Sequence, residues 1–216
     1  MGTSTSTCTH TSSSFFAPDY ALAPEGAIVI NLTSPTLSAA PVQDLDLLPT
    51  PHIAVSIEED VRISRCWKFA GGQGHVAIKL AKDIQLSNIT IHYPDHRELP
   101  SWRQMEVPKL FRVWALLTSD VVVPPSLSSQ FLINWEVFAS FTKRPVKSSA
   151  LFDASMFVHA ATISYDVQQG MRQTFPLQTP IRLSTSVVVI EKLDNQGGSS
   201  TCLHRFAIHG EEVALL

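Results

Sequence analysis

Apolar and polar residues alternate in short runs along most of the chain, and turn-forming residues separate the runs. The clearest run is 75–80, where Val76, Ile78 and Leu80 share one face of an extended segment. Residues 53–57 alternate in the same way. Similar apolar runs occupy 28–30, 89–91, 111–114, 163–165, 187–190 and 203–208. A period of two with Gly, Pro, Asn and Ser between the runs predicts an all-β, antiparallel β-sandwich.

Helical periodicity is weak, and fourteen prolines spread along the chain disfavour long helices. Residues 126–140 fit either a helix or a loop containing a strand, because Phe131, Ile133, Trp135 and Val137 alternate. The chain has 216 residues, which suits one sandwich domain.

The boundaries of this domain follow from composition. Residues 1–16 are rich in Ser and Thr and are expected to form a disordered leader, so that the domain spans 17–216. Residues 34–50 and 119–155 are long connections between apolar runs. Connections of this length are usually functional or disordered.

Composition and motifs narrow the classes of function. A net charge of −3 without a Lys/Arg cluster gives no basis for nucleic-acid binding. No nucleophile elbow, metalloprotease motif or phosphate-binding loop is present, so we expect no enzyme activity. The segment 71–74 is glycine-rich but runs into a strand, which indicates a tight turn. Trp67, Phe69, Trp114 and Phe206 are expected in the core.

The three cysteines, Cys8, Cys66 and Cys202, allow one disulfide with one thiol left over. None of them lies in a CxxC pair, and their spacing does not match a structural zinc site. From spacing alone, Cys66 and Cys202 are equally well explained as a bridge or as free, buried, small apolar residues. Arg205 likewise fits either a carboxylate partner or a solvated head on a packed stem.

Three segments carry a resemblance to a known family. They are Cys66-Trp67-Lys68-Phe69-Ala70-Gly71, Pro108-Lys109-Leu110-Phe111, and 202–210 with its Cys-Leu-His-Arg-Phe start and His-Gly end. In this order and spacing they resemble the SUN domain, and the resemblance runs over nearly the whole chain from about residue 17. It implies a jelly-roll-like sandwich with a disulfide between Cys66 and Cys202, and a lid at 34–50. Residues 119–155 would be an insertion.

The resemblance also implies a partner and an assembly. SUN domains form homotrimers that bind the C-terminal tail of KASH-type proteins of the outer nuclear membrane. The tail adds a strand to the sheet and is held by its terminal carboxylate. The domain would then be a non-enzymatic adaptor of the nuclear envelope, part of the LINC complex between nucleus and cytoskeleton.

Four residues at the expected peptide-binding pocket depart from the family pattern. Ser200 and His204 stand where the family has tyrosines, Tyr93 stands where it has a histidine, and Glu106 replaces a serine. We expect the carboxylate to dock near Tyr93, Ser200 and His204. Glu106 would repel it, and a cationic His204 would offset that repulsion, so affinity would fall as pH rises through the pKa of this histidine.

The family also wraps a monovalent cation such as K+ in the loop before the first cysteine. Here that loop runs from Val55 to Cys66 and contains Glu58, Asp60 and Arg65. Because His204 replaces a tyrosine ligand and Arg65 adds positive charge, we expect an ordered loop with a weakly bound ion or none.

The expected location is the perinuclear, lumenal side of the inner nuclear membrane. Residues 1–14 lack the features of a signal peptide, and no apolar stretch is long enough to cross a bilayer. Membrane anchoring is therefore expected through sequence not in this chain. Two alternatives remain open: a carbohydrate- or glycoprotein-binding sandwich and a SUN-like folding factor of the endoplasmic reticulum.

Overall fold

Antiparallel β-strands build the part of the chain that the computed structural model describes, namely residues 17–30, 56–117, 132–134, 156–177 and 184–212. The main sheet has the order β1-β3-β8-β4-β6-β5, and β7 and β10 also pair with β3. A separate ribbon joins β2 to β9. The strands are β1 (Ile28–Val29), β2 (Trp67–Ala70), β3 (Gly74–His92), β4 (Pro108–Leu117), β5 (Leu132–Asn134), β6 (Met156–Ser164), β7 (Arg172–Pro176), β8 (Ser184–Asn195), β9 (Ser200–Leu203) and β10 (Arg205–Glu212). The all-β antiparallel prediction is confirmed.

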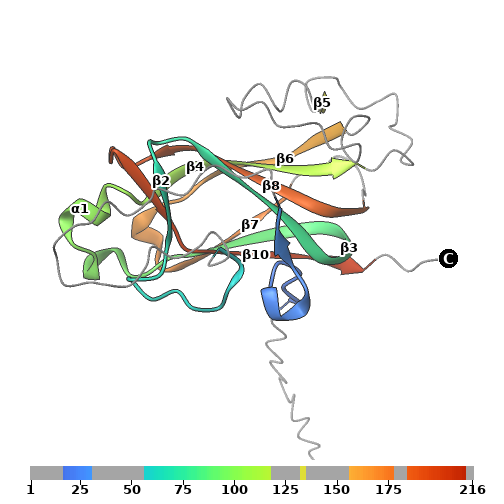
Figure 1. Cartoon of the computed structure of the whole chain (residues 1–216), viewed down its shortest axis with the longest axis horizontal. Coiled ribbons are helices and arrows are strands. Elements are labelled where there is room, and N and C mark those ends of the chain that lie inside the picture. Colours follow the sequence, from blue (N-terminus) through green and yellow to red (C-terminus); the bar gives the residue numbers. More distant parts are fainter. Residues whose placement is uncertain (1–16, 31–55, 118–131, 135–155, 178–183, 213–216) are drawn as a thin grey trace, which may run out of the picture.

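Helical structure in the described residues is confined to single turns. They are the 3-10 turns η1 (Ala23–Glu25), η3 (His96–Glu98) and η5 (Val167–Gln169), the helix α1 (Ser101–Gln104), and a turn that includes residues 56 and 57. No helix within the described ranges is long and apolar enough to cross a membrane. Figure 1 shows α1 and β2 at one end of the sandwich, away from the end of β10.

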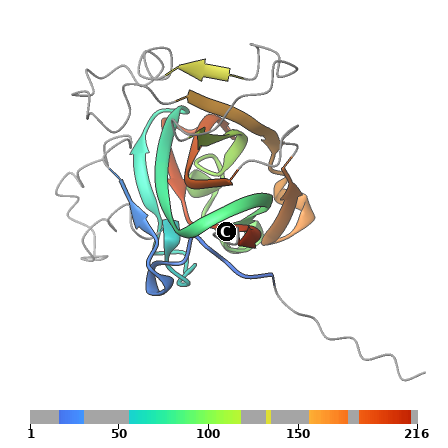
Figure 2. The same cartoon turned by 90° about the vertical axis from the view of Figure 1, so that its right-hand side faces the viewer.

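The long strand β3 belongs to both layers of the sandwich. Its first half pairs with β1 and β8, and its second half pairs with β10 on one side and β7 on the other. The pairing with β8 shifts register between Lys79 and Ile84, where the strand passes from one layer to the other. The strands consequently wrap around one interior (Figure 2).

The sheet is apolar on both faces. A strict alternation of apolar and polar residues would have left one face polar. Val76 and Ile78 of β3 join the large interior cluster, which also contains Phe111 and Phe206. The intervening Ala77 joins a second cluster on the opposite face. That second cluster consists of Ala77, Trp114, Leu116, Phe157, Val187 and Val189. The four aromatic residues expected in the core are buried, but Trp114 lies in the second cluster.

The segment before η1 is tied to the last strand. The backbone N–H of Tyr20 donates to the carbonyl of Ile208 at 2.9 Å, and the Asp19 carboxylate accepts from the N–H of Ile208 at 2.9 Å. Arg205 forms an ion pair with Asp19, and both side chains are nearly buried. Of the two interpretations of Arg205, pairing with a carboxylate is the one observed.

Three expectations for local structure need correction. Ser56 and Ile57 form a helical turn instead of ending a strand, and residues 53–55 lie outside the described residues. The expected strand 203–208 is two strands, because the chain leaves the ribbon at His204 and enters the main sheet at Arg205. Within 126–140, residues 132–134 are a strand.

Other expectations fall on parts that are not described. The leader 1–16, the lid 34–50, and the connection 119–155 apart from β5 lie outside the described residues. The boundary of the domain at residue 17 therefore stays a prediction.

Candidate functional site

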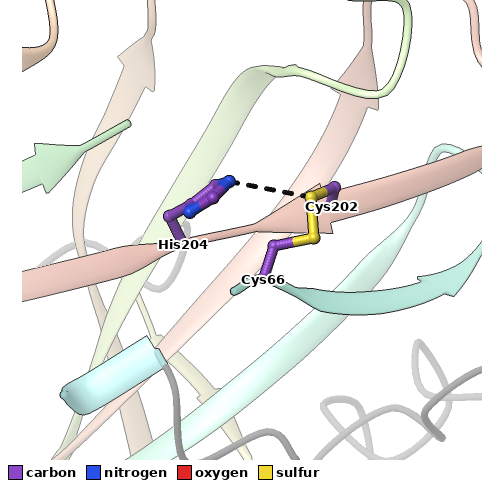
Figure 3. Close-up of side chains that lie close together, drawn as sticks. All are labelled: Cys66, Cys202 and His204. Carbon is purple, nitrogen blue, oxygen red and sulfur yellow. Dashed lines mark hydrogen bonds between the residues drawn. A yellow bond between two sulfur atoms is a disulfide. The ribbon is translucent and has the colours of Figure 1, made fainter. Parts of the chain in front are cut away.

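The two cysteine segments meet where the ribbon joins the main sheet. Lys68 of β2 lies opposite Cys202 of β9 in the ribbon, and Cys66 immediately precedes β2. Cys66 and Cys202 form a disulfide with a Cα–Cα distance of 5.4 Å across 136 residues of sequence (Figure 3). Both are buried, at 4% and 1% exposure, and the bridge ties the ribbon to the loop that precedes it.

Tyr93 and His204 pack against this disulfide. The Tyr93 hydroxyl donates to the carbonyl of Cys202 at 2.6 Å, and its ring meets the His204 ring edge-on at 4.5 Å between centroids. Nε2 of His204 lies 3.7 Å from Sγ of Cys202. The two residues that the sequence places at the pocket are therefore together, but both are buried.

Burial determines the charge of His204. Loss of water around the ring, and secondarily the positive charge of Arg103, lower the pKa of His204 to about 3. The imidazole is therefore neutral at neutral pH. Burial of the ring argues against the expectation that a cationic His204 offsets Glu106, and the effect of pH on binding stays a prediction.

Glu106 and Ser200 form the other half of the expected pocket. The Ser200 hydroxyl donates to Oε1 of Glu106 at 2.5 Å, and Nζ of Lys68 pairs with the same oxygen at 2.5 Å. The backbone carbonyl of Glu106 also accepts from the N–H of Cys202 at 3.2 Å. Glu106 is therefore part of a local ion pair with Lys68, which compensates the charge that the sequence analysis expects to repel a carboxylate.

Arg103 is the residue that sequence reasoning missed. Its Nη1 lies 3.6 Å from each sulfur of the disulfide and donates to the carbonyl of Ile63 at 2.7 Å. The guanidinium lies 5.1 Å from the centroid of the Trp102 ring, which is 55% exposed. Among the described residues no carboxylate forms an ion pair with the half-buried Arg103. This side chain thus contributes a net positive charge at the site.

The loop before Cys66 carries its own ion pairs. Arg65 contacts Oε2 of Glu58 at 2.5 Å and Oδ2 of Asp60 at 3.6 Å, and Arg62 pairs with Asp60 at 2.5 Å. Hydrogen bonds from Arg62 lower the pKa of Asp60 to about 2. The carboxylates that the sequence offers to a cation are therefore paired with arginine side chains. Val55 lies outside the described residues.

A pocket of about 320 Å³ is lined in part by Tyr93. It is bounded by Tyr93 and residues 94–97, by Val107, and by the segment around η5 with Tyr165 and Met171. The Tyr93 and Tyr165 ring centroids are 6.0 Å apart. The pocket therefore shares one wall with the disulfide site without including the disulfide.

The fold and the site together define a β-sandwich whose terminal strands are closed by a buried disulfide. Residues 49–127 match the family described as Sad1/UNC-like C-terminal. The chain is 26% identical over 155 residues to SUN domain-containing protein 3 of Mus musculus, which covers 71% of this chain and 38% of the relative. It is 29% identical over 158 residues to sperm-associated antigen 4 protein of the same organism, covering 73% of this chain and 28% of the relative. The chain is therefore similar to SUN domain proteins, at modest identity.

Solved structures agree on the fold. A putative chitobiase fragment from Bacteroides thetaiotaomicron superposes with a TM-score of 0.57 at 9% identity, covering 95% of this chain and 99% of that one. A family 32 carbohydrate-binding module from Streptococcus pneumoniae EndoD superposes with a TM-score of 0.51 at 12% identity, covering 90% and 100%. At such identities the likeness shows the sandwich fold alone.

Proposed function

We propose that this domain is a non-enzymatic adaptor of the nuclear envelope, and that it binds the C-terminal tail of a KASH-type protein. The observation that carries the proposal is the meeting of the SUN-like segments at one place. Cys66, Cys202, Tyr93 and Ser200 lie together at the junction of ribbon and sheet, although they come from distant parts of the chain. The similarity to SUN domain proteins supports the assignment to the nuclear envelope.

The tail would bind as an added strand, with backbone hydrogen bonds for affinity and side-chain pockets for specificity. The pocket beside Tyr93 is of a size to take one side chain of the tail. Residues 34–50 would fold over the bound tail as a lid. A homotrimer would provide three such sites and the avidity that a load-bearing link needs.

Arg103 is the group best suited to bind the terminal carboxylate. The Tyr93 hydroxyl is already committed to the carbonyl of Cys202, and the Ser200 hydroxyl to Glu106. His204 is neutral and buried. Arg103 is half-buried, lacks a described carboxylate partner and is permanently charged. A guanidinium and a carboxylate form a charge-assisted pair, so Arg103 would take the role that the sequence suggested for His204.

The chain spans 38% and 28% of the length of the two mouse relatives, so the activity of a whole protein is part of the proposal. The domain would face the perinuclear lumen, and its anchor in the inner membrane would be supplied by sequence outside this chain. An oxidising lumen suits the buried disulfide.

The test is the affinity of a labelled KASH-type tail peptide for the domain fused to a trimeric coiled coil, measured by fluorescence anisotropy. The peptide is used with a free C-terminal carboxylate and with an amidated C-terminus. We expect amidation to weaken binding at least about tenfold, which corresponds to the roughly 1.5–3 kcal/mol of a hydrogen bond to a charged group. Equal affinity of the two peptides, or no binding of either, would remove the proposal.

The same assay examines pH. Since burial keeps His204 neutral, affinity should be constant between about pH 6 and pH 8. A fall in affinity as pH rises across this interval would indicate that a histidine binds the terminal carboxylate.

A further inference from the structure

The disulfide and His204 form a compact group of soft and borderline ligand atoms. The two sulfurs of Cys66 and Cys202 and a ring nitrogen of His204 all lie within 4.8 Å of one another, and all three residues are buried. Figure 3 shows the His204 ring turned so that one nitrogen points at the sulfur of Cys202. The group joins residues 136 positions apart, which is why no metal-ligand spacing is visible in the sequence.

The distance between nitrogen and sulfur matches a metal site. Zinc holds thiolate sulfur at about 2.3 Å and imidazole nitrogen at about 2.0–2.1 Å in a tetrahedron, so the two ligand atoms are about 3.6 Å apart. Nε2 of His204 lies 3.7 Å from Sγ of Cys202. The histidine therefore needs little movement relative to Cys202 to become a ligand. The two bonded sulfurs would have to separate.

We propose that the reduced domain binds a divalent transition metal of the zinc type through Cys66, Cys202 and His204. A dithiol reductant supplies two electrons and two protons. The sulfur–sulfur bond of the domain breaks, two thiols form, and the reductant becomes a disulfide. The metal then displaces the two thiol protons to solvent, and two thiolates balance its double positive charge. A water molecule would take the fourth position of the tetrahedron.

The surrounding side chains are placed to support such a site. The Tyr93 ring packs edge-on against His204 and its hydroxyl holds the carbonyl of Cys202, so both ligands have fixed orientations. Nη1 of Arg103 lies 3.6 Å from both sulfurs and can donate hydrogen bonds to thiolates outside the coordination sphere. Contacts of this kind fix the orientation of the ligands, and the guanidinium would compensate part of the negative charge of the two thiolates.

A metal at this site would be a second way, besides the disulfide, to link β9 to the start of β2. The disulfide joins the ribbon strand β9 to the start of β2 when the cysteines are oxidised. A bound metal would keep the same two segments together in reducing surroundings. His204 is the determinant of this property, since the two cysteines alone offer only two ligands.

The experiment uses Co2+ as a spectroscopic probe with the full chain in a Cys8→Ser background, which removes the third thiol. After reduction and removal of the reductant under nitrogen, Co2+ should give thiolate-to-metal absorption in the near ultraviolet and d–d bands of a tetrahedral site, saturating at one ion per chain. The oxidised protein should give neither. His204→Gln should weaken Co2+ binding at least about tenfold, and the matched variant His159→Gln, on β6, should not.

A thermal scan separates a folded site from thiols of an unfolded chain. A metal that binds the folded form raises the midpoint of unfolding of the reduced protein, whereas binding to the unfolded chain lowers it. We expect Zn2+ to raise the midpoint of the reduced protein and to have a much smaller effect on His204→Gln. Absorption that is the same in His204→Gln, or a midpoint that Zn2+ fails to raise, overturns the proposal.

Discussion

Reduction of the Cys66–Cys202 disulfide should remove a large part of the stability of the domain. The bridge closes a loop of 136 residues, and it limits the unfolded chain more than the folded one. The chain-entropy relation gives about 5 kcal/mol at 25 °C for a loop of this length. Domains of this size are commonly stable by only about 5–15 kcal/mol. Reduction should therefore leave a marginally stable or unfolded protein.

The measurement is guanidinium chloride unfolding of the oxidised and the reduced chain, followed by tryptophan fluorescence. Reduction is preferable to an alanine variant because it keeps both buried side chains and opens no cavity. Cys8→Ser prevents exchange with the third thiol, and EDTA excludes a metal at the reduced site. We expect the free energy of unfolding to fall by about 3–5 kcal/mol and the slope against denaturant to rise, since the reduced unfolded chain expands. A loss below about 1 kcal/mol would refute the argument from loop closure.

Three further predictions concern the core and the ion-paired loop. Burial lowers the pKa of Lys192 from 10.5 to about 7, so between these pH values the unfolded chain binds a proton that the folded chain does not. The free energy of unfolding, measured with urea, should therefore rise from about pH 7 to pH 10. The variant Lys192→Met should abolish that rise. Gly74→Ala should cost about 1–3 kcal/mol because a Cβ there would lie 2.4 Å from the buried Phe69 ring, whereas Gly72→Ala, with its nearest atom at 3.8 Å, should cost much less in the same assay. Replacing K+ by a large organic cation at equal ionic strength should leave the melting temperature unchanged, because Arg65 pairs with Glu58; a clear fall would reveal a bound ion.

The strand pattern was predictable because short apolar runs bounded by turn residues indicate strands, whether one face or both are buried. The run 75–80 is recovered inside β3, and 111–114 and 187–190 lie inside β4 and β8. The joining of 75–80 and 89–91 into one strand was not visible, since residues 81–83 carry exposed or half-exposed side chains. Residues 81–83 pass between the two layers because different strands pair with the two halves of β3. Pairing between strands that are distant in sequence leaves no signal in the local sequence.

The sequence predicts which residues meet at the candidate site, but it does not predict their charges or hydrogen bonds. The resemblance brought Cys66, Cys202, Tyr93 and His204 together, as the structure does. The charge of His204 depends on burial by neighbours from other strands, which a single sequence does not report. Arg103 lies in a polar stretch without a motif, so only its position 3.6 Å from both sulfurs reveals it.

The central claim is that a terminal carboxylate binds beside the disulfide at Arg103, and a double-mutant cycle tests it most directly. Anisotropy would give the affinity of free and amidated tail peptides for the trimeric wild-type domain and for Arg103→Gln, with Arg62→Gln as an exposed-arginine control. We predict that amidation costs at least about tenfold in the wild type and in Arg62→Gln, and almost nothing in Arg103→Gln. An amidation penalty of equal size in Arg103→Gln would place the carboxylate elsewhere and contradict the account.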